Sequence, residues 1–360
     1  MTHIAINGRF LTRPATGVDR FAYELLRAWL PRANGMHDIR ALVPAKSEPR
    51  NAHGLRVETS KVGTLTGHAW EQLELSRYCG DDLLLNLCNT GPVARQRQLV
   101  VLHDAGFIRQ PQTYSFAFRR AYRWLFSGLM HRARTVATVS KFSAEELLTL
   151  VGGRARGIEL IHGAGEHVLR VMSDTSILER LGLETRRYVL AVGSRTPNKN
   201  LSGVLKASEL LTDLGYKFVA AGGSNSRVFN GVTLNDDSLV LPGYVTDGEL
   251  RALYENAACF VFPSFYEGFG LPPLEAMHCG CPVVVSSRAS LPEVCGQAAM
   301  YCDPNDPRDI AAQLRAVLTT ESLRNDLREA GFARARAFSW SRSAAQLEHL
   351  LGAGPLRAVA

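Results

Sequence analysis

The sequence predicts an α/β protein of two Rossmann-like domains, each a mainly parallel sheet covered by helices on both faces. Short apolar runs recur along the chain, and helical patterns such as 19–30 and 143–150 lie between several of them. The runs form two series, one beginning at His3 and the other at Tyr188. The 360 residues are enough for two domains of ordinary size. Because ligands of such sheets bind beyond the carboxyl ends of the strands, we expect a binding cleft between the domains.

Each domain is expected to carry its own set of strands. The predicted strands cover residues 3–6, 39–43, 83–87, 99–102, 136–139, 158–161, 188–192, 218–221, 239–241, 258–264 and 282–286. Helical patterns close the chain over 308–318, 322–337 and 343–351. A polar stretch that begins at Ser173 marks the change from one set to the other. We therefore expect domains over 1–175 and 176–340, followed by a terminal helix within 341–360.

The composition is typical of a soluble globular protein of the cytoplasm. Hydrophobic residues make up 46% and charged residues 21%, and no run of about 18 apolar residues predicts a transmembrane helix. The first residues enter a strand at once, without the pattern of a signal peptide. The seven cysteines are an odd number and lie mostly in apolar runs, which favours reduced thiols. Cys279 and Cys281 have no second ligand pair nearby, so we expect no metal there.

The charge is divided unevenly along the chain. Residues 1–175 contain 23 Arg and Lys against 15 Asp and Glu, a net charge of +8, whereas the remainder has 18 against 19, a net charge of −1. The basic half should face an anionic partner. Its aromatic and arginine-rich segment 116–126 fits a helix on an anionic membrane surface, and a core helix with solvated arginines is an equal alternative. Nucleic acid is not expected, because no nucleic-acid-binding motif is present.

The most informative stretch follows the predicted strand 258–264. It is a Gly-rich loop over 265–271 that enters a helix, and such a loop presents backbone N–H groups to an anion. Glu267 and Glu275 flank the loop, and carboxylates accept hydrogen bonds from hydroxyl groups rather than binding phosphate. The pattern predicts a ligand that carries both phosphate and sugar. The alternative is that Glu275 stabilises the first helical turn and the glycines form a tight turn.

Two more helix starts follow strands of the second domain. Strand 188–192 leads through a glycine turn to Arg195 and Lys199 and then to a helix. Backbone amides, helix dipole and two cations all favour a diphosphate at this point, although two solvated loop cations would give the same pattern. Further along, Ser290 and Glu293 have the spacing of a capping box.

The first domain has two candidate sites of its own. His103 and Asp104 follow the predicted strand 99–102, where an α/β cleft places reactive groups, but a lone histidine is as often structural. Gly17 and Asp19 lie in the turn before the first helix. Asp19 is an equally good candidate for capping that helix.

Together these motifs resemble the signature of the retaining GT-B glycosyltransferases of family 4. The resemblance rests on Glu267 and Glu275, separated by Gly-Phe-Gly-Leu-Pro-Pro-Leu, and on the Glu-Ala-Met and Gly-Cys-Pro-Val-Val that follow. It implies that Glu267 contacts hydroxyl groups of the donor sugar and that Glu275 holds the nucleotide ribose. The amides that would face the sugar and the diphosphate belong to Phe269, Gly270 and Leu271.

The resemblance also implies roles for the remaining candidates. Arg195 and Lys199 would neutralise the donor diphosphate, and His103 would hydrogen-bond the transferred sugar. Asp104 would orient its loop or the acceptor. The loop that approaches the diphosphate and the acceptor contains Gly17, Asp19 and Arg20, and the base would contact the backbone near Tyr244 and Val245. Many members have two adjacent glycines where this chain has Gly17 alone.

The function implied is transfer of a hexose, best matched by mannose from GDP-mannose, to a glycan or lipid-linked saccharide in bacterial polysaccharide biosynthesis. The resemblance assigns acceptor binding to 1–175 and nucleotide-sugar binding to 176–340, with the helix in 341–360 crossing back to the first domain. No cofactor, metal or protein nucleophile is expected. We expect a cytoplasmic protein, peripheral on the inner face of the cytoplasmic membrane. A nucleotide-sugar epimerase of the same fold and a non-catalytic nucleotide-sugar-binding scaffold are the alternatives, and a glycan phosphorylase fits less well.

Overall fold

The computed structural model describes residues 2–50, 54–152, 157–194, 196–222 and 239–352. The chain divides into two compact units: unit 1, Met1–Gly163 with Trp340–Ala360, and unit 2, Ala164–Ser339. The division falls between Gly163 and Ala164 rather than after residue 175, because the short helix η4 (Glu166–Arg170) packs on α10 (Leu271–His278) of unit 2.

Unit 1 contains a sheet that has seven strands, all parallel, within its described residues. In spatial order the strands are β3 (Thr59–Val62), β2 (His37–Pro44), β1 (Thr2–Asn7), β4 (Leu83–Asn86), β5 (Gln98–Val101), β6 (Thr135–Thr138) and β7 (Glu159–Leu160). The strand order reverses at β1, which pairs with both β2 and β4. The loops that follow β1 and β4 therefore diverge, which is where open parallel sheets bind ligands.

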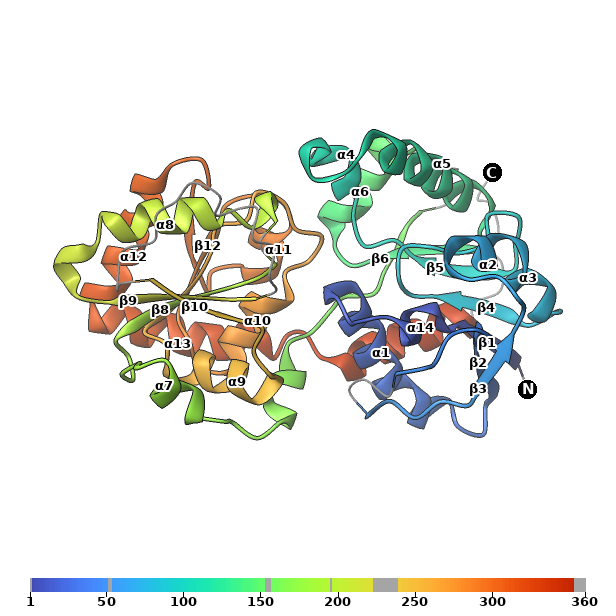
Figure 1. Cartoon of the computed structure of the whole chain (residues 1–360), viewed down its shortest axis with the longest axis horizontal. Helices are drawn as coiled ribbons and strands as arrows, with labels where there is room; N and C mark the ends of the chain where they lie inside the picture. The colour runs from blue at the N-terminus through green and yellow to red at the C-terminus, as the bar shows by residue number, and fades with distance from the viewer. Residues whose placement is uncertain (1, 51–53, 153–156, 195, 223–238, 353–360) are drawn as a thin grey trace. The chain divides into compact units, whose positions relative to one another are not determined.

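Helices cover both faces of this sheet (Figure 1). Apolar side chains of β1 and β4 pack with α2 (Gly67–Leu73) and α3 (Leu75–Tyr78), while β5 packs with α5 (Phe116–Arg132) and α6 (Lys141–Leu150). The other helices of the unit are α1 (Gly17–Ala33), α4 (Gly106–Arg109), α14 (Trp340–Gly352), η1 (Gly8–Thr12) and η3 (Pro111–Thr113).

The last helix, α14, belongs to unit 1 and packs along α1. Its Glu348 accepts hydrogen bonds from Trp29 Nε1 at 2.7 Å and pairs with His37 Nε2 at 2.8 Å. Trp29 is completely buried, so this carboxylate satisfies an indole N–H that would otherwise be left without a partner.

Unit 2 contains a second parallel sheet, with six strands in the described residues. In spatial order they are β10 (Leu239–Gly243), β9 (Lys217–Ala221), β8 (Tyr188–Val192), β11 (Cys259–Phe262), β12 (Val283–Ser286) and β13 (Met300–Cys302). Here the order reverses at β8, between β9 and β11. The loops after β8 and β11 are therefore the ones that diverge and leave room for a ligand.

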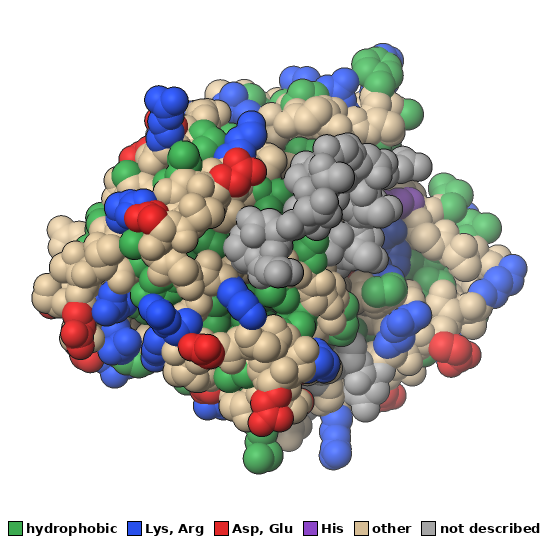
Figure 2. Space-filling view, turned by 60° about the vertical axis from the view of Figure 1, so that its left-hand side comes forward, with side chains coloured by type: hydrophobic (Ala, Val, Ile, Leu, Met, Phe, Trp, Pro, Cys, Tyr) green, Lys and Arg blue, Asp and Glu red, His purple; other side chains and the backbone are tan. Residues whose placement is uncertain are grey.

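The unit 2 sheet is also covered on both faces (Figure 1). The helix α8 (Leu201–Glu209) packs with α12 (Pro307–Thr319), and α10 packs with α9 (Asp247–Asn256) and α13 (Glu321–Ala335). The remaining helices are α7 (Ser176–Arg180), α11 (Leu291–Cys295), η5 (Pro197–Lys199) and η6 (Thr212–Leu214). On the face drawn in Figure 2, basic and acidic side chains of this unit lie side by side, in keeping with the small net charge of that half of the sequence.

Candidate functional site

The loops after β8 and β9 approach each other so closely that only glycine fits at the contact. Gly222 has φ +147°, and a Cβ atom added there would lie 1.9 Å from the carbonyl oxygen of Gly193. Gly193 donates its N–H to Ala221 O at 3.0 Å, and Gly222 donates to Gly243 O at 2.9 Å. These contacts hold the loop ends of three neighbouring strands together at the edge where the sheet order reverses.

Lys199 and Glu267, predicted from two separate motifs, meet in the structure. The Nζ of Lys199 lies 2.6 Å from Oε1 of Glu267, and both side chains are largely shielded, with 21% and 12% of their surface exposed. The same Nζ lies 4.9 Å from the centre of the Phe262 ring, at the end of β11. The cation is thus held over the divergence of β8 and β11. Arg195, its predicted partner, lies outside the described residues.

Asn200 explains why Lys199 is held at this place. Asn200 is buried and adopts the left-handed conformation with φ +54°. Its Nδ2 donates to the carbonyl oxygens of Pro263 and Pro304, at 3.2 and 2.7 Å, and its Oδ1 caps α8 by accepting from Gly203 N–H. One side chain therefore ties the lysine turn to the loops after β11 and β13. The sequence interpretation did not single out this residue.

The loop between Glu267 and α10 has the shape expected for a ligand-facing helix start. Gly270, at the N-cap position, has φ +101°, and no side chain of the described residues caps the helix there. Pro272 and Pro273 have no N–H, so the amide of Leu271 is the first that α10 can present to a ligand.

The capping box predicted for Ser290 and Glu293 does not form. Ser290 has helical backbone angles and makes no capping hydrogen bond. Its buried hydroxyl lies within hydrogen-bond distance of the carbonyl oxygens of Glu267 and Phe269, at 3.0 and 2.9 Å. The serine therefore holds the loop of the first glutamate instead of starting its own helix.

Glu275 lies inside α10 and is only 8% exposed. Its Oε1 lies 3.0 Å from His167 Nε2, and its Oε2 accepts a hydrogen bond from the Tyr254 hydroxyl at 3.1 Å. A Cβ atom at Gly165 would lie 2.6 Å from the backbone of α10, so only glycine lets η4 bring His167 to this carboxylate. These contacts fix the carboxylate within the body of the helix, and it does not cap the first turn.

The residues expected beside a nucleobase lie at the start of α9. Tyr244 is 83% exposed and Val245 is partly exposed, in the loop that follows β10. Thr246 then caps α9 in a capping box with Glu249. The hydrogen bond from Gly222 to Gly243 places this loop next to the loops of Lys199, so an exposed ring is available near the candidate phosphate site.

In unit 1, His103 is a buried neutral imidazole at the end of β5. Burial lowers its pKa to about 4. Its Nε2 lies 2.9 Å from the carbonyl oxygen of Leu87, which can only accept, so Nε2 carries the proton. Nδ1 is then an acceptor, which suits a ligand hydroxyl group. The ring also packs edge-on against Phe21 at 4.8 Å.

Asp19 is the N3 residue of a capping box and not the N-cap itself. Its Oδ2 accepts from both the N–H and the hydroxyl of Thr16, at 2.9 and 2.7 Å, while its Oδ1 pairs with Arg13 at 2.6 Å. Arg20 lies 3.9 Å from Glu24, one helical turn further on. Gly17 begins α1 with no positive φ, and a Cβ there would meet nothing within 4 Å. The fold of unit 1 therefore does not require glycine at this position.

Asp104 lies in the same loop as His103. Unit 1 also contains a group of polar side chains that the sequence interpretation missed. Asp104 Oδ1 accepts from Gly106 N–H at 2.7 Å. Close to the ends of β1 and β4, Arg9 pairs with the fully buried Glu71 at 3.1 Å, and Tyr122 OH lies 3.4 Å from His68 Nε2. These residues come from separate helices and loops, so no local motif could have revealed them.

The fold and the family match define the class of protein. The crystal structure of Anabaena Alr3699/HepE in complex with UDP and glucose has a TM-score of 0.76 to this chain, with 15% identity over 98% of this chain and 100% of that one. The model of the family Glycosyl transferases group 1 matches residues 174–334. The fold is therefore GT-B, and the chain is a glycosyltransferase.

Two relatives from Escherichia coli place it more closely. O-antigen chain mannosyltransferase B is 34% identical over 266 residues, which cover 71% of this chain and 70% of the relative. Serotype-specific mannosyltransferase WbdA is 30% identical over 228 residues, 59% of this chain but 28% of that longer relative. The chain belongs to the group 1 glycosyltransferases, and its resemblance to the mannosyltransferase-like members of family 4 is confirmed.

Within the described residues, no helix combines the length and the apolar character needed to cross a bilayer.

Proposed function

We propose that this glycosyltransferase moves mannose from GDP-mannose, with retention of anomeric configuration, to a glycan or lipid-linked saccharide in O-antigen-type polysaccharide biosynthesis. The observation that carries the proposal is the Lys199–Glu267 pair at the divergence of β8 and β11, directly before the open start of α10. A cation for phosphate and a carboxylate for sugar hydroxyls lie together there. The mannosyltransferase relatives support mannose as the transferred sugar.

Donor binding would exchange one partner for another at this pair. The diphosphate would interact with Lys199 Nζ, with the amide of Leu271 and with the positive end of the α10 dipole. Glu267 is then released to accept hydrogen bonds from sugar hydroxyls. As the bond between the anomeric carbon and the phosphate oxygen breaks, Lys199 stabilises the negative charge that develops on GDP. Arg195 and Glu275 keep their proposed contacts with the diphosphate and the ribose.

The contact of His103 with the transferred sugar needs no charge on the imidazole. A neutral His103 accepts a hydrogen bond from a hydroxyl of that sugar at Nδ1, because Nε2–H is engaged by Leu87 O. The attacking acceptor hydroxyl forms the new bond to the anomeric carbon and passes its proton to an oxygen of the departing diphosphate. Asp104 and the loop of Gly17, Asp19 and Arg20 orient the acceptor in this proposal.

A thermal-shift panel of GDP, UDP, ADP and their common sugar conjugates tests the donor. A ligand that binds only the native state raises the apparent stability, so GDP and GDP-mannose should raise Tm and the other nucleotides should not. Stabilisation by UDP compounds alone would contradict GDP-mannose as donor. Conversion of the nucleotide sugar without an acceptor would indicate the epimerase instead, and binding without any turnover would indicate the scaffold.

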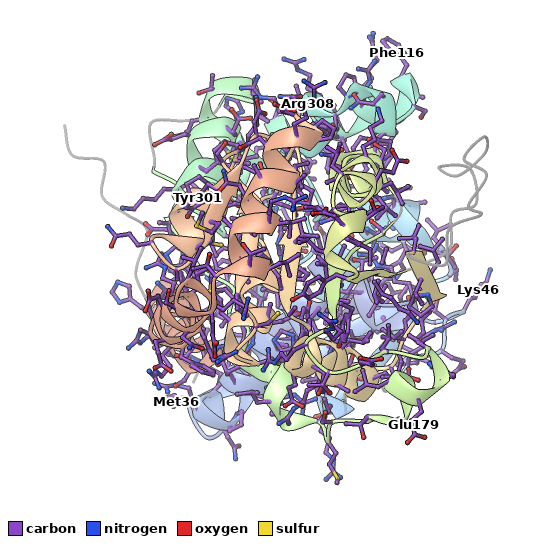
Figure 3. All side chains as sticks on the ribbon, turned by 90° about the vertical axis from the view of Figure 1, so that its left-hand side faces the viewer. Met36, Lys46, Phe116, Glu179, Tyr301 and Arg308 are labelled. Carbon is purple, nitrogen blue, oxygen red and sulfur yellow. The ribbon has the colours of Figure 1, made fainter. Side chains whose placement is uncertain are left out.

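We also propose that unit 1 contacts an anionic membrane surface through the outer face of α5. Residues of this face line a surface hollow of about 560 Å³: Arg120, Arg123, Trp124, Ser127, Gly128, His131 and Arg132. Trp124 is 64% exposed and Phe116 is 70% exposed, and Figure 3 shows Phe116 projecting outward. Arginines suit anionic headgroups and exposed aromatics suit the interfacial region.

Flotation with vesicles tests this face. The protein should float with vesicles that contain phosphatidylglycerol and remain behind with phosphatidylcholine alone, and Arg120→Glu with Trp124→Ala should abolish flotation. Arg308→Glu, an exposed arginine of unit 2, is the matched control. Equal flotation of the double variant and the control would contradict the proposed surface.

A further inference from the structure

Unit 1 has a second group of polar side chains at the reversal of its strand order, between β1 and β4. Arg9, just after β1, lies 3.1 Å from Glu71 and 3.0 Å from the hydroxyl of Thr90, which follows β4. Glu71 is fully buried and also accepts from Thr90 at 2.9 Å. On the outer side of this pair, the hydroxyl of Tyr122 lies 3.4 Å from Nε2 of His68, whose side chain is 48% exposed. The group runs from a buried ion pair to an accessible rim.

A row of aromatic rings continues that rim toward the loop of His103. The ring of Tyr122 stacks on Phe118 at 4.0 Å, and Phe118 stacks on Tyr114 at 5.2 Å. Tyr114 ends the row and is 36% exposed. Burial chiefly raises the pKa of the Tyr114 phenol, and the nearby Asp104 carboxylate adds to that rise. This electrostatic interaction links the exposed end of the row to the Asp104 carboxylate.

The charges of this surface are already compensated. Arg9 is paired with Glu71, and Arg13 is paired with the fully buried Asp19 at 2.6 Å. A phosphate would have to compete with two buried carboxylates for these guanidinium groups, at a high desolvation cost. A sugar ring has no such difficulty, because its hydroxyls take single hydrogen bonds from mixed donors and acceptors, and its C–H face packs on an aromatic ring.

We propose that His68, Tyr114, Tyr122 and Asp104 bind the acceptor and that the acceptor end they take is an uncharged saccharide, not a phosphorylated sugar. The inference rests on the proposed glycosyl transfer and adds the chemical class of the acceptor and the side chains that recognise it. A purely structural role accounts for the buried Arg9–Glu71 pair. It does not account for the partly exposed Tyr122 phenol and the 48% exposed His68 imidazole, nor for the exposed Tyr114 at the end of the aromatic row.

Binding measured without turnover separates this inference from the proposed function. The binding of two probes, methyl α-mannoside and mannose 6-phosphate, is measured by saturation-transfer NMR on the full chain. The wild type should bind methyl α-mannoside more tightly than mannose 6-phosphate. Tyr122→Phe and Tyr114→Ala should each weaken the binding of methyl α-mannoside about three- to tenfold, because each variant loses one hydrogen bond or one ring contact. Tyr78→Phe, at an exposed tyrosine on α3, should bind like the wild type.

Kinetics give the second readout. With GDP-mannose and a soluble manno-oligosaccharide, Tyr122→Phe should raise the acceptor KM by the same factor, with a much smaller change in the KM for GDP-mannose. Equal binding of methyl α-mannoside by Tyr122→Phe and wild type, or tighter binding of mannose 6-phosphate, would overturn the inference. Saccharide binding by a wild type that transfers no sugar would support this site and contradict the proposed function.

Discussion

Both units have a point at which the strand order of the parallel sheet reverses, but different groups fill that point in each unit. In unit 2, the reversal of strand order is filled by backbone turns with one lysine and one glutamate, which are 2.6 Å apart. In unit 1, the corresponding reversal is filled by side chains from separate helices and loops around the buried Glu71. A diphosphate can be bound by turns and a helix start, whereas a sugar needs side chains at several angles. The comparison predicts that mutations in the two units have different effects on transfer kinetics and on stability.

The largest effect is expected at the unit 2 cation. Lys199→Ala should lower kcat/KM for transfer about 10²–10³-fold, because under the proposed function it removes the charge that would stabilise the departing diphosphate. The measurement is initial-rate kinetics with GDP-mannose. Lys206→Ala, at an exposed position of α8, is the matched control and should behave like the wild type. Kinetics of Lys199→Ala equal to those of the control would refute the diphosphate assignment.

The next largest effect is a loss of stability in acid, which we expect because the folded state disfavours protonation of the buried His103 in unit 1. Burial lowers the pKa of His103 to about 4, below the ordinary value of about 6.5, so the unfolded state binds the proton first. The contribution of the neutral imidazole to the free energy of unfolding is therefore complete above pH 6.5. It is lost as the pH falls toward 4, and the loss is at most about 3 kcal/mol. Urea unfolding across this range should show a smaller loss for His103→Gln.

The exposed His3 provides the control for that experiment. His3→Gln should retain the full loss of the wild type. In unit 2, burial likewise lowers the pKa of His278 to about 4, so His278→Gln should reduce the loss in the same direction. An unchanged acid profile in His103→Gln would mean that this imidazole is not held neutral.

A smaller effect is expected for the serine that holds the Glu267 loop. Ser290→Ala leaves two carbonyl oxygens without their hydroxyl partner and should cost about 1–3 kcal/mol in the free energy of unfolding. Transfer should fall about tenfold, mainly in kcat, because the loop amides lose their position. Thermal unfolding and initial rates measure both, with the exposed Ser287→Ala as control. Full activity in a destabilised Ser290→Ala would show that the contact serves the fold alone.

The smallest effect on the fold belongs to Gly17. Gly17→Ala should change the free energy of unfolding by no more than about 0.5 kcal/mol, because the added Cβ meets nothing within 4 Å. If the loop approaches the donor or acceptor, kcat/KM should still fall about threefold. Wild-type kinetics in Gly17→Ala would remove this residue from the binding site.

The sequence was sufficient for the GT-B fold and for the pattern of most elements. It missed β3, whose residues Thr59–Val62 are mostly polar, and β13, which has only three residues. Apolar runs signal strands buried on both faces; β3 has no such run, and β13 is apolar but too short to be recognised as a strand. The boundary after residue 175 was placed too late because η4 packs with unit 2 through Gly165, a contact that depends on tertiary structure.

The candidate site was predictable only where a motif is local. Lys199 and Glu267 were found because each lies in a short loop after a strand. Ser290 was misinterpreted because spacing alone cannot distinguish a capping box from a hydroxyl that bonds a neighbouring loop. His167 and Tyr254 contact Glu275 only through the packing of η4 and α9 on α10.

The most direct test of the central claim is an NMR time course of GDP-mannose mixed with a soluble manno-oligosaccharide and the wild-type protein. Mannose in GDP-mannose is α-linked, so retention predicts that a new α-mannosyl anomeric signal grows in step with the release of GDP. A β-linked product, or an unchanged oligosaccharide while the nucleotide sugar is bound or converted, would contradict the account.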